Sequence, residues 1–314
     1  MKRIILERLA MSVPLLLLVT GLVFVLQSFL PGDVANYIAG LDAPAEQVQQ
    51  IREELRLDDP VVEQYLRWLG AAVQGDLGQS LVNGEPVVTA LSARLGVTLS
   101  LVGLMTVVSL VVGVLVGIVS ATSGRSVRAV TDVVSILGLA IPNYFLGIVL
   151  AAIFAVWLGW LPANGYSAPR DGVGGWLWSM TLPVMTLAFW AVTSIAKQTR
   201  DGMMDALSMD FVRNLRANGL PERRVIYRHA LRNASLPVLA VSGQIFVAAV
   251  GSSVIVEQVF GLPGLGGLAV NATATNDIPL IQGVTLYFTI IVIVVNLTLD
   301  ILYSVVNPRV RTGR

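Results

Sequence analysis

The feature that most constrains this chain is a series of six long apolar runs, each near the length needed to cross a lipid bilayer. A spanning helix needs about 20 mostly apolar residues. The whole sequence is 55% hydrophobic and 13% charged, with a mean hydropathy of +0.74, which is typical of an integral membrane protein. We therefore predict an all-α membrane protein with six transmembrane helices, at roughly Leu9–Leu30, Val97–Ser120, Val133–Leu158, Trp176–Ala196, Leu236–Val256 and Ile281–Val306.

The first run follows the residues MKRIILER and could be mistaken for a secretory signal peptide. Its apolar stretch is too long for the hydrophobic region of a signal peptide, and no small-residue cleavage site follows it. We interpret it as a retained anchor.

Basic residues are distributed unevenly among the segments between the runs. Three precede the first run, two follow the second, eight lie from Lys197 to Arg232, and three lie in the C-terminal tail. Sixteen of the 21 basic residues thus fall on one side and five on the other. Because Lys and Arg are enriched in cytoplasmic loops, the pattern predicts a multi-pass protein with both termini in the cytoplasm.

Residues 31–94 fall on the opposite side and predict a helical extracytoplasmic insertion. Asp42 can cap a helix that begins near Pro44, and a second helix is expected from Pro60. Each would carry one apolar face, formed by Val48, Ile51 and Leu55, and by Val61, Tyr65, Trp68 and Leu69. These faces would pack on the outer ends of the spans. Two surface helices with no role in binding a partner are the alternative.

Several kinds of chemistry are excluded by residue usage. The chain has no cysteine and one histidine, His229, so disulfides, thiol catalysis and histidine clusters are excluded. A P-loop needs a lysine after a glycine-rich turn, and neither Lys2 nor Lys197 has that context. We therefore expect no catalytic residue, metal site or bound cofactor on this chain. If ATP and Mg²⁺ drive the protein, a partner subunit binds them.

Ionisable groups within the spans mark proton or ion pathways in many carriers. Here Glu257 lies at the outer end of the fifth run, Asp300 in the inner part of the sixth, and Asp132 at the inner edge of the third. These positions form no relay through the middle of the membrane.

Three amides lie deeper in the runs, at Asn143, Gln244 and Asn296. They either line a translocation path or form hydrogen bonds between packed spans. Pro142 interrupts the third run and frees backbone groups that must be satisfied elsewhere. A kink at a gate and a static bend are both consistent with this proline.

The basic segment has its own local pattern. Residues 210–217 suit a short helix that Gly219 and Pro221 end, and a second helix is expected from Glu222, ahead of the span that opens at Leu236. A short helix on the membrane surface offers a compact shape to a soluble partner. The alternative is a basic loop held by anionic lipid headgroups, but the glycine-bounded helix pair favours a partner.

The segment DFVRNLRANGLPERRVIYRHALRNASLP resembles the EAA loop of the B-type permease subunits of dipeptide, oligopeptide and nickel ABC importers. Gly219 matches the central glycine of that loop, and residues 229–232 match the ending found in the peptide subgroup. Arg213, Asn214 and Leu215 stand where the general form has Glu-Ala-Ala, and the peptide subgroup has a similarly degenerate triplet.

The similarity extends along nearly the whole chain. Further segments that look like this family are PGDVANYIAG, LRLDDPVVEQYLRWL, GDLGQSL, IPNYFLGIVL, LGWLPANGY, VEQVFGLPGLGGLAV and the NPRVR tail. The resemblance implies a type I ABC importer permease fold in the bacterial inner membrane. It also implies a domain of residues 1–96, comprising the first span and the insertion, and a five-helix core of residues 97–314 that contains an ATPase-docking loop at 200–236.

The resemblance further implies function and partners. The chain would be a non-catalytic permease that translocates di- or oligopeptides delivered by an extracytoplasmic substrate-binding protein. It would pair with a second homologous permease as a heterodimer and with two ATP-binding cassette ATPases, within membrane lipid and without nucleic acid. Its docking residues would be Asp210, Arg213, Asn214, Leu215, Arg216, Ala217, Gly219, Leu220, Arg223, Arg224, Arg228 and His229. The alternatives are a nickel or other small-solute ABC importer, an ion-coupled secondary carrier, and a membrane scaffold.

Overall fold

A computed structural model describes residues 2–29, 34–40 and 43–306 of the 314-residue chain. Within this part of the chain the regular structure is helical, apart from an isolated antiparallel bridge between Gln79 and Pro86. The prediction of an all-α fold is confirmed.

Five helical segments among the described residues are long and apolar enough to cross a membrane. They are α1 (Lys2–Gln27), α5 (Val87–Thr122), α8 (Val173–Ser208), a continuous segment Glu222–Val259, and α13 (Ile278–Val306). The continuous segment consists of α10 (Glu222–Arg224), the π-helix η3 (Val225–Ala230) and α11 (Leu231–Val259). Each of the five overlaps one predicted span.

The remaining predicted span is broken. In its place α6 (Arg125–Ala140) is followed by α7 (Asn143–Leu150) and the π-helix η1 (Ala151–Trp157), with a bend of 104° between the two parts. Pro142 has no backbone N–H and disfavours a helical conformation at the residue before it. Ile141 is accordingly extended, with φ −84° and ψ 121°. Among the described residues there are therefore six candidate spans only if this bent pair counts as one.

The chain divides into two compact units. The first unit comprises Leu99–Leu262 and the residues from Val295 onward, and the second comprises Lys2–Thr98 and Pro263–Val294. Each unit thus draws on two stretches of sequence. The division into domains of residues 1–96 and 97–314 stays a prediction.

The second unit contains the predicted insertion helices, α3 (Ala45–Glu54) and α4 (Val61–Val73). The apolar face of α4 packs on α1, as expected for a helix that covers the end of a span. The Tyr65 ring lies 5.6 Å from that of Phe24, and its hydroxyl is 3.0 Å from Oγ1 of Thr20. Asp42, the predicted cap of α3, lies outside the described residues.

Two short helices of the second unit were not predicted, α2 (Val34–Ala39) and α12 (Leu265–Ala274). The six residues of α2 are too few to show a helical period, and the apolar residues of α12 are not confined to one face of the helix. One face of α12 enters a buried apolar cluster with the start of α5 and the start of α13, formed by Leu77, Val87, Leu91, Leu265, Leu268, Leu280 and Val284. Asp277, between α12 and α13, accepts hydrogen bonds from Ser80 Oγ and from Leu81 N at 3.2 Å.

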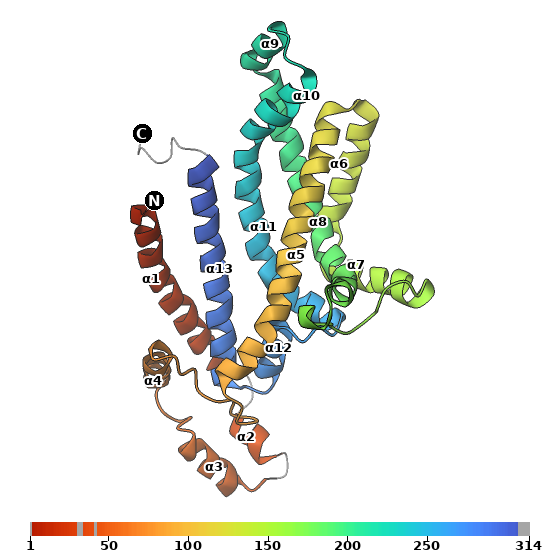
Figure 1. The fold of residues 1–314 in the computed structure, drawn as a ribbon. Helices are drawn as coiled ribbons and strands as arrows, with labels where there is room; N and C mark the ends of the chain where they lie inside the picture. The colour runs from red at the N-terminus through yellow and green to blue at the C-terminus, as the bar shows by residue number, and fades with distance from the viewer. Residues whose placement is uncertain (1, 30–33, 41–42, 307–314) are drawn as a thin grey trace. The chain divides into compact units, whose positions relative to one another are not determined.

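In the first unit α5, α6, α8 and α11 run alongside one another, and α8 packs extensively on α11 (Figure 1). A short 3₁₀ turn, η2 (Pro169–Asp171), precedes α8, and α9 (Asp210–Ala217) follows it. The segment that the sequence marks as a docking loop is therefore carried on the ends of two long, mutually packed helices.

Candidate functional site

The predicted docking loop is an ordered element centred on α9, beyond the ends of α8 and α11 (Figure 1). Met209 interrupts the helical run with an extended backbone, φ −71° and ψ 150°, so α9 starts in a new direction. The predicted helix over residues 210–217 is confirmed at both ends.

A Schellman motif ends α9. The amide of Gly219 donates to the carbonyl of Arg216 at 3.0 Å, and the amide of Leu220 donates to that of Leu215 at 3.1 Å. This geometry needs a residue with positive φ, which only glycine adopts at little cost. Gly219 has φ +76°, the left-handed conformation common at the end of a helix. Pro221 then begins the return of the chain.

An ion pair closes the turn between α9 and the helix that follows it. Arg216 donates from Nε to Oε2 of Glu222 at 3.0 Å and from Nη2 to Oε1 at 2.6 Å. These hydrogen bonds raise the pKa of the Arg216 guanidinium above its ordinary value. A two-bond contact between a guanidinium and a carboxylate fixes orientation as well as distance. The pair therefore holds the end of α9 and the start of the next helix in a fixed relative position.

The base of the element is apolar and closely packed. Val212 of α9 and Val225 of η3 are fully buried. Met203 and Ala206, near the end of α8, pack with Ala230 and Ala234 at the start of α11. This packing joins the end of α8 to the start of α11 at the base of the docking loop.

The outer surface of the element carries the predicted docking residues. Leu215, Leu220 and His229 are half-buried, and the other members are exposed: Asp210, Arg213, Asn214, Arg216, Ala217, Gly219, Arg223, Arg224 and Arg228. The exposed apolar side chains of Met204, Met209 and Tyr227 lie in the same stretch of sequence. The structure thus displays basic and apolar groups together, a composition suited to a protein surface as well as to lipid headgroups.

Two boundaries differ from the sequence prediction. The helix α8 extends to Ser208, twelve residues beyond the predicted end of its span, because Met203 and Ala206 give its charged end an apolar face. The second docking helix and the fifth span were predicted as separate elements, with the span opening at Leu236. They form one helix from Glu222 to Val259 that passes through Pro237. A proline removes one helical hydrogen bond, and here the helix continues.

Glycines on α5 bring that helix very close to α8. A Cβ atom built on Gly113 would lie 2.8 Å from Cβ of Ile195, and one on Gly117 would lie 2.5 Å from Cβ of Thr199. From the first contact to the second, the sequence advances by four residues on α5 and by four residues on α8. The two helices therefore run parallel through this contact. The pattern is a GxxxG pair, which lets the backbones of membrane helices approach closely. The sequence contains this signal, but it was not among our predictions.

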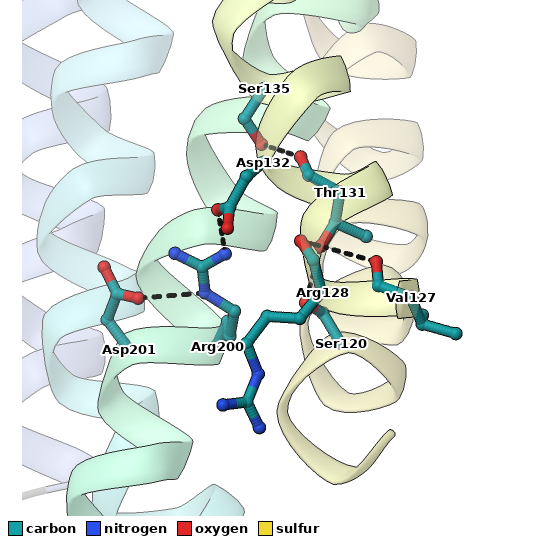
Figure 2. Close-up of polar contacts among 8 residues, drawn as sticks. All are labelled: Ser120, Val127, Arg128, Thr131, Asp132, Ser135, Arg200 and Asp201. Atoms are coloured by element: carbon teal, nitrogen blue, oxygen red, sulfur yellow. Dashed lines mark hydrogen bonds and ion pairs between the residues drawn. The ribbon is translucent and has the colours of Figure 1, made fainter. Parts of the chain in front are cut away.

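The helix α6 approaches α8 in the same way. A Cβ atom on Gly138 would lie 2.5 Å from Cγ2 of Thr193. Nearer the docking end, Arg200 of α8 donates from Nη1 to the carboxylate of Asp132 of α6 (Figure 2). From the Gly138–Thr193 contact to the Asp132–Arg200 contact, the sequence goes back six residues on α6 and forward seven on α8. The two helices therefore pack antiparallel.

Arg200 holds two carboxylates at once. Its Nε also donates to Oδ1 of Asp201 at 3.1 Å (Figure 2). The Arg200 side chain is 12% exposed, whereas those of Asp132 and Asp201 are 49% and 48% exposed. Ion pairs with exposed partners contribute about 0–1 kcal/mol, so we expect these contacts to add little to the stability of the fold.

Further polar groups surround the ion pair on α6. Thr131 forms a 2.7 Å hydrogen bond with Ser120 of α5, and Ser135 donates to the carbonyl of Thr131. The side chain of Arg128 extends from the same helix, and its Nε is buried with no hydrogen-bond partner among the described residues (Figure 2). The sequence placed Asp132 only at the inner edge of a span, so this cluster was missed.

The residues predicted to line a path lie on three different helices, α7, α11 and α13. Asn143 is the first residue of α7, immediately after the bend, and Gln244 and Asn296 are exposed on α11 and α13. No hydrogen bond links any of these three side chains to another described residue. Their place on a translocation path stays a prediction.

These observations define an all-α, multi-pass membrane protein with an ordered basic element beyond the ends of its spans. The chain belongs to the family of binding-protein-dependent transport system inner membrane components. Residues 113–312 match that family, and residues 1–102 match its N-terminal region. Members are the non-catalytic membrane subunits of ABC importers, which work with separate ATPase and substrate-binding components. The resemblance to permease subunits of ABC importers is confirmed.

Relatives are similar over their full lengths. A protein of Brucella abortus assigned as a peptide transport system permease is 41% identical over 313 residues, 99% of each chain. The oligopeptide transport system permease protein AppB of Bacillus subtilis is 37% identical over 98% of each chain. The glutathione transport system permease protein GsiC of Escherichia coli is 36% identical, also over 98% of each chain.

Proposed function

We propose that this chain is the permease subunit of an ATP-driven importer whose cargo is peptides. The relatives named above belong to peptide, oligopeptide and glutathione systems, and all match over nearly the whole chain. Glutathione is itself a short peptide, so one substrate class unites the three. An ion-coupled carrier working alone has no support from these matches.

The observation that carries the mechanism is the construction of the docking element. Its Schellman-capped helix and its Arg216–Glu222 clamp keep a basic surface in one shape, while its buried base joins α8 to α11. A partner that grips α9 would therefore move both long helices together. In this mechanism ATP binding draws two ATPase subunits together, and the docking element carries that movement into the spans.

The assembly we propose contains this chain, a second homologous permease as a heterodimer, two ATPases that bind ATP and Mg²⁺, and an extracytoplasmic binding protein. This chain itself binds no cofactor. The uneven distribution of basic residues supports cytoplasmic termini and a cytoplasmic docking element in the bacterial inner membrane. The α3–α4 insertion would then lie outside, on the side of the binding protein.

Transport by the reconstituted assembly tests the proposed cargo. Proteoliposomes that contain this chain with its partner permease, ATPases and binding protein should accumulate labelled di- or oligopeptides when ATP is supplied. The purified chain alone should hydrolyse no ATP. A complex that moves Ni²⁺ and none of a panel of di-, tri- and oligopeptides would refute the peptide proposal.

Labelling of single cysteines tests the orientation directly, because the native chain has no cysteine. Asn218 lies in the docking turn and Asn83 in the loop before α5, and both are exposed. In intact cells Asn83→Cys should react with an impermeant maleimide, and Asn218→Cys should react only after the membrane is permeabilised. The reverse pattern would place the docking element outside and exclude contact with cytoplasmic ATPases.

A further inference from the structure

We propose that Arg200 is a positioning residue that couples the docking element to α6, and that its bond to Asp132 opens and closes during transport. The inference rests on the proposed function, because it assigns a part of the coupling path within the importer. It starts from the four charged groups at the crossing of α6 and α8, namely Arg128, Asp132, Arg200 and Asp201 (Figure 2).

The four groups carry two positive and two negative charges, so the cluster is neutral as a whole. A neutral cluster has little attraction for an anionic lipid headgroup or another external ion. Three of its charges, on Asp132, Arg200 and Asp201, pair with one another. This favours a role within the protein over a role in binding a ligand.

Each member of the bond between helices has an oppositely charged residue close to it in sequence on its own helix. Arg200 already donates to Asp201, the next residue of α8. Asp132 lies four residues after Arg128 on α6, a spacing at which side chains of a helix meet. Arg128 Nε is buried and without a partner while Asp132 is engaged by Arg200. If α6 and α8 part, Asp132 can therefore pair with Arg128, and Arg200 can remain with Asp201.

The cluster thus has two arrangements, and Arg128 lacks a carboxylate partner only in the linked one. In the linked arrangement Arg200 joins α6 to α8, and in the released arrangement each helix closes its own pair. Packed interfaces with two such discrete arrangements are the elements that convert small displacements into switches. The Gly138–Thr193 contact lies about 9 Å further along α6 and offers a pivot that stays closed in both arrangements.

The position of Arg200 connects this switch to the docking element. It lies on α8 just before Met203 and Ala206, which are packed into the buried base of that element. Movement of α9 can therefore pass to the end of α8 and along that continuous helix to Arg200. Release or closure of the Asp132 bond then determines whether α6 and the bent segment beyond it follow.

Opposite substitutions should separate the two arrangements in the reconstituted importer. Asp132→Asn removes the carboxylate that both arrangements use, so α6 is no longer linked to α8, and ATP hydrolysis should continue while peptide transported per ATP falls about tenfold, within the range usual for coupling between sites. Arg128→Gln removes the released pair, so hydrolysis and transport should fall together at an unchanged ratio. Asp132→Glu keeps the carboxylate and should retain coupling. Asp205→Asn, at an exposed carboxylate one turn further along α8, is the matched control.

A distance measurement provides a readout that does not depend on the cargo. Spin labels at Ser126→Cys on α6 and Asp205→Cys on α8 should report a change in separation between the nucleotide-free importer and the importer trapped with ATP and vanadate. Asp132→Asn should give the separated population without nucleotide.

The outcomes distinguish this proposal from the proposed function. An unchanged distance on trapping, or native transport per ATP in Asp132→Asn, overturns the coupling role of Arg200 and leaves the peptide proposal standing. A native importer that moves no peptide but shows the distance change overturns the cargo and supports the switch. A loss of protein from the membrane in Asp132→Asn and Asp132→Glu alike, with Arg128→Gln unaffected, would show a structural ion pair and overturn the switch.

Discussion

Replacing Gly117 by valine should remove most of the folded chain from the membrane. A Cβ atom at this position would lie 2.5 Å from Cβ of Thr199 and 2.7 Å from the carbonyl oxygen of Ala196. The second of these atoms belongs to the backbone of α8 and has no rotamer by which to move away. Overpacking costs about 1–3 kcal/mol where side chains can adjust, so we expect a cost at or above the top of that range. Membrane abundance and melting temperature in detergent measure the effect.

Gly103 offers a matched control on the same helix. A Cβ atom built there meets no other atom within 4 Å, so the same change from glycine to valine adds no clash within this chain. Gly103→Val should accumulate nearly as the native chain does. Equal abundance and equal melting temperature for the two variants would show that α5 and α8 do not depend on this close approach.

Replacing Gly219 by valine should leave the chain in the membrane and impair transport. No atom lies within 4 Å of the position where a Cβ would stand, so the substitution creates no clash. Its effect is on the backbone, because Gly219 has φ +76°. The left-handed conformation costs an ordinary L-residue roughly 1–2 kcal/mol. This cost lowers the population of the native turn, relative to other conformations, by about 5- to 30-fold. Transport should fall accordingly, with weaker co-purification of the ATPases.

Asparagine separates the effect of backbone conformation from the effect of adding a side chain at the same position. It tolerates positive φ better than other non-glycine residues, so Gly219→Asn should keep much of the activity that Gly219→Val loses. If Gly219→Val assembles with the ATPases and transports at the native rate, α9 does not need its Schellman turn, and the docking role proposed for it is wrong.

The parts of this fold that follow from local sequence were predictable. Apolar runs of membrane length indicated the spans, and the helix over residues 210–217 followed from Gly219 and Pro221. The positive φ of Gly219 was likewise predictable, since few residues other than glycine end a helix in this way.

The parts that depend on packing between distant segments were not predicted. Nothing near Lys197 in the sequence shows that α8 continues to Ser208, because the packing of Met203 and Ala206 against α11 decides it. The pairing of Asp132 with Arg200 joins residues on different spans, and each alone reads as an ordinary charge at the edge of a membrane. Pro142 indicated an interruption, but the angle of 104° depends on where α7 packs.

The unbroken helix from Glu222 to Val259 has a consequence for how force travels. Its 38 residues would make a rod roughly 57 Å long, with one end in the docking turn and the other at the far limit of the fifth span. A rigid helix transmits rotation as well as displacement along its axis. A small tilt imposed at Glu222 would therefore produce a lateral displacement at Val259. The wider winding of η3 lies close to the driven end, so bending there would reduce the displacement at Val259 more than bending further along the helix would.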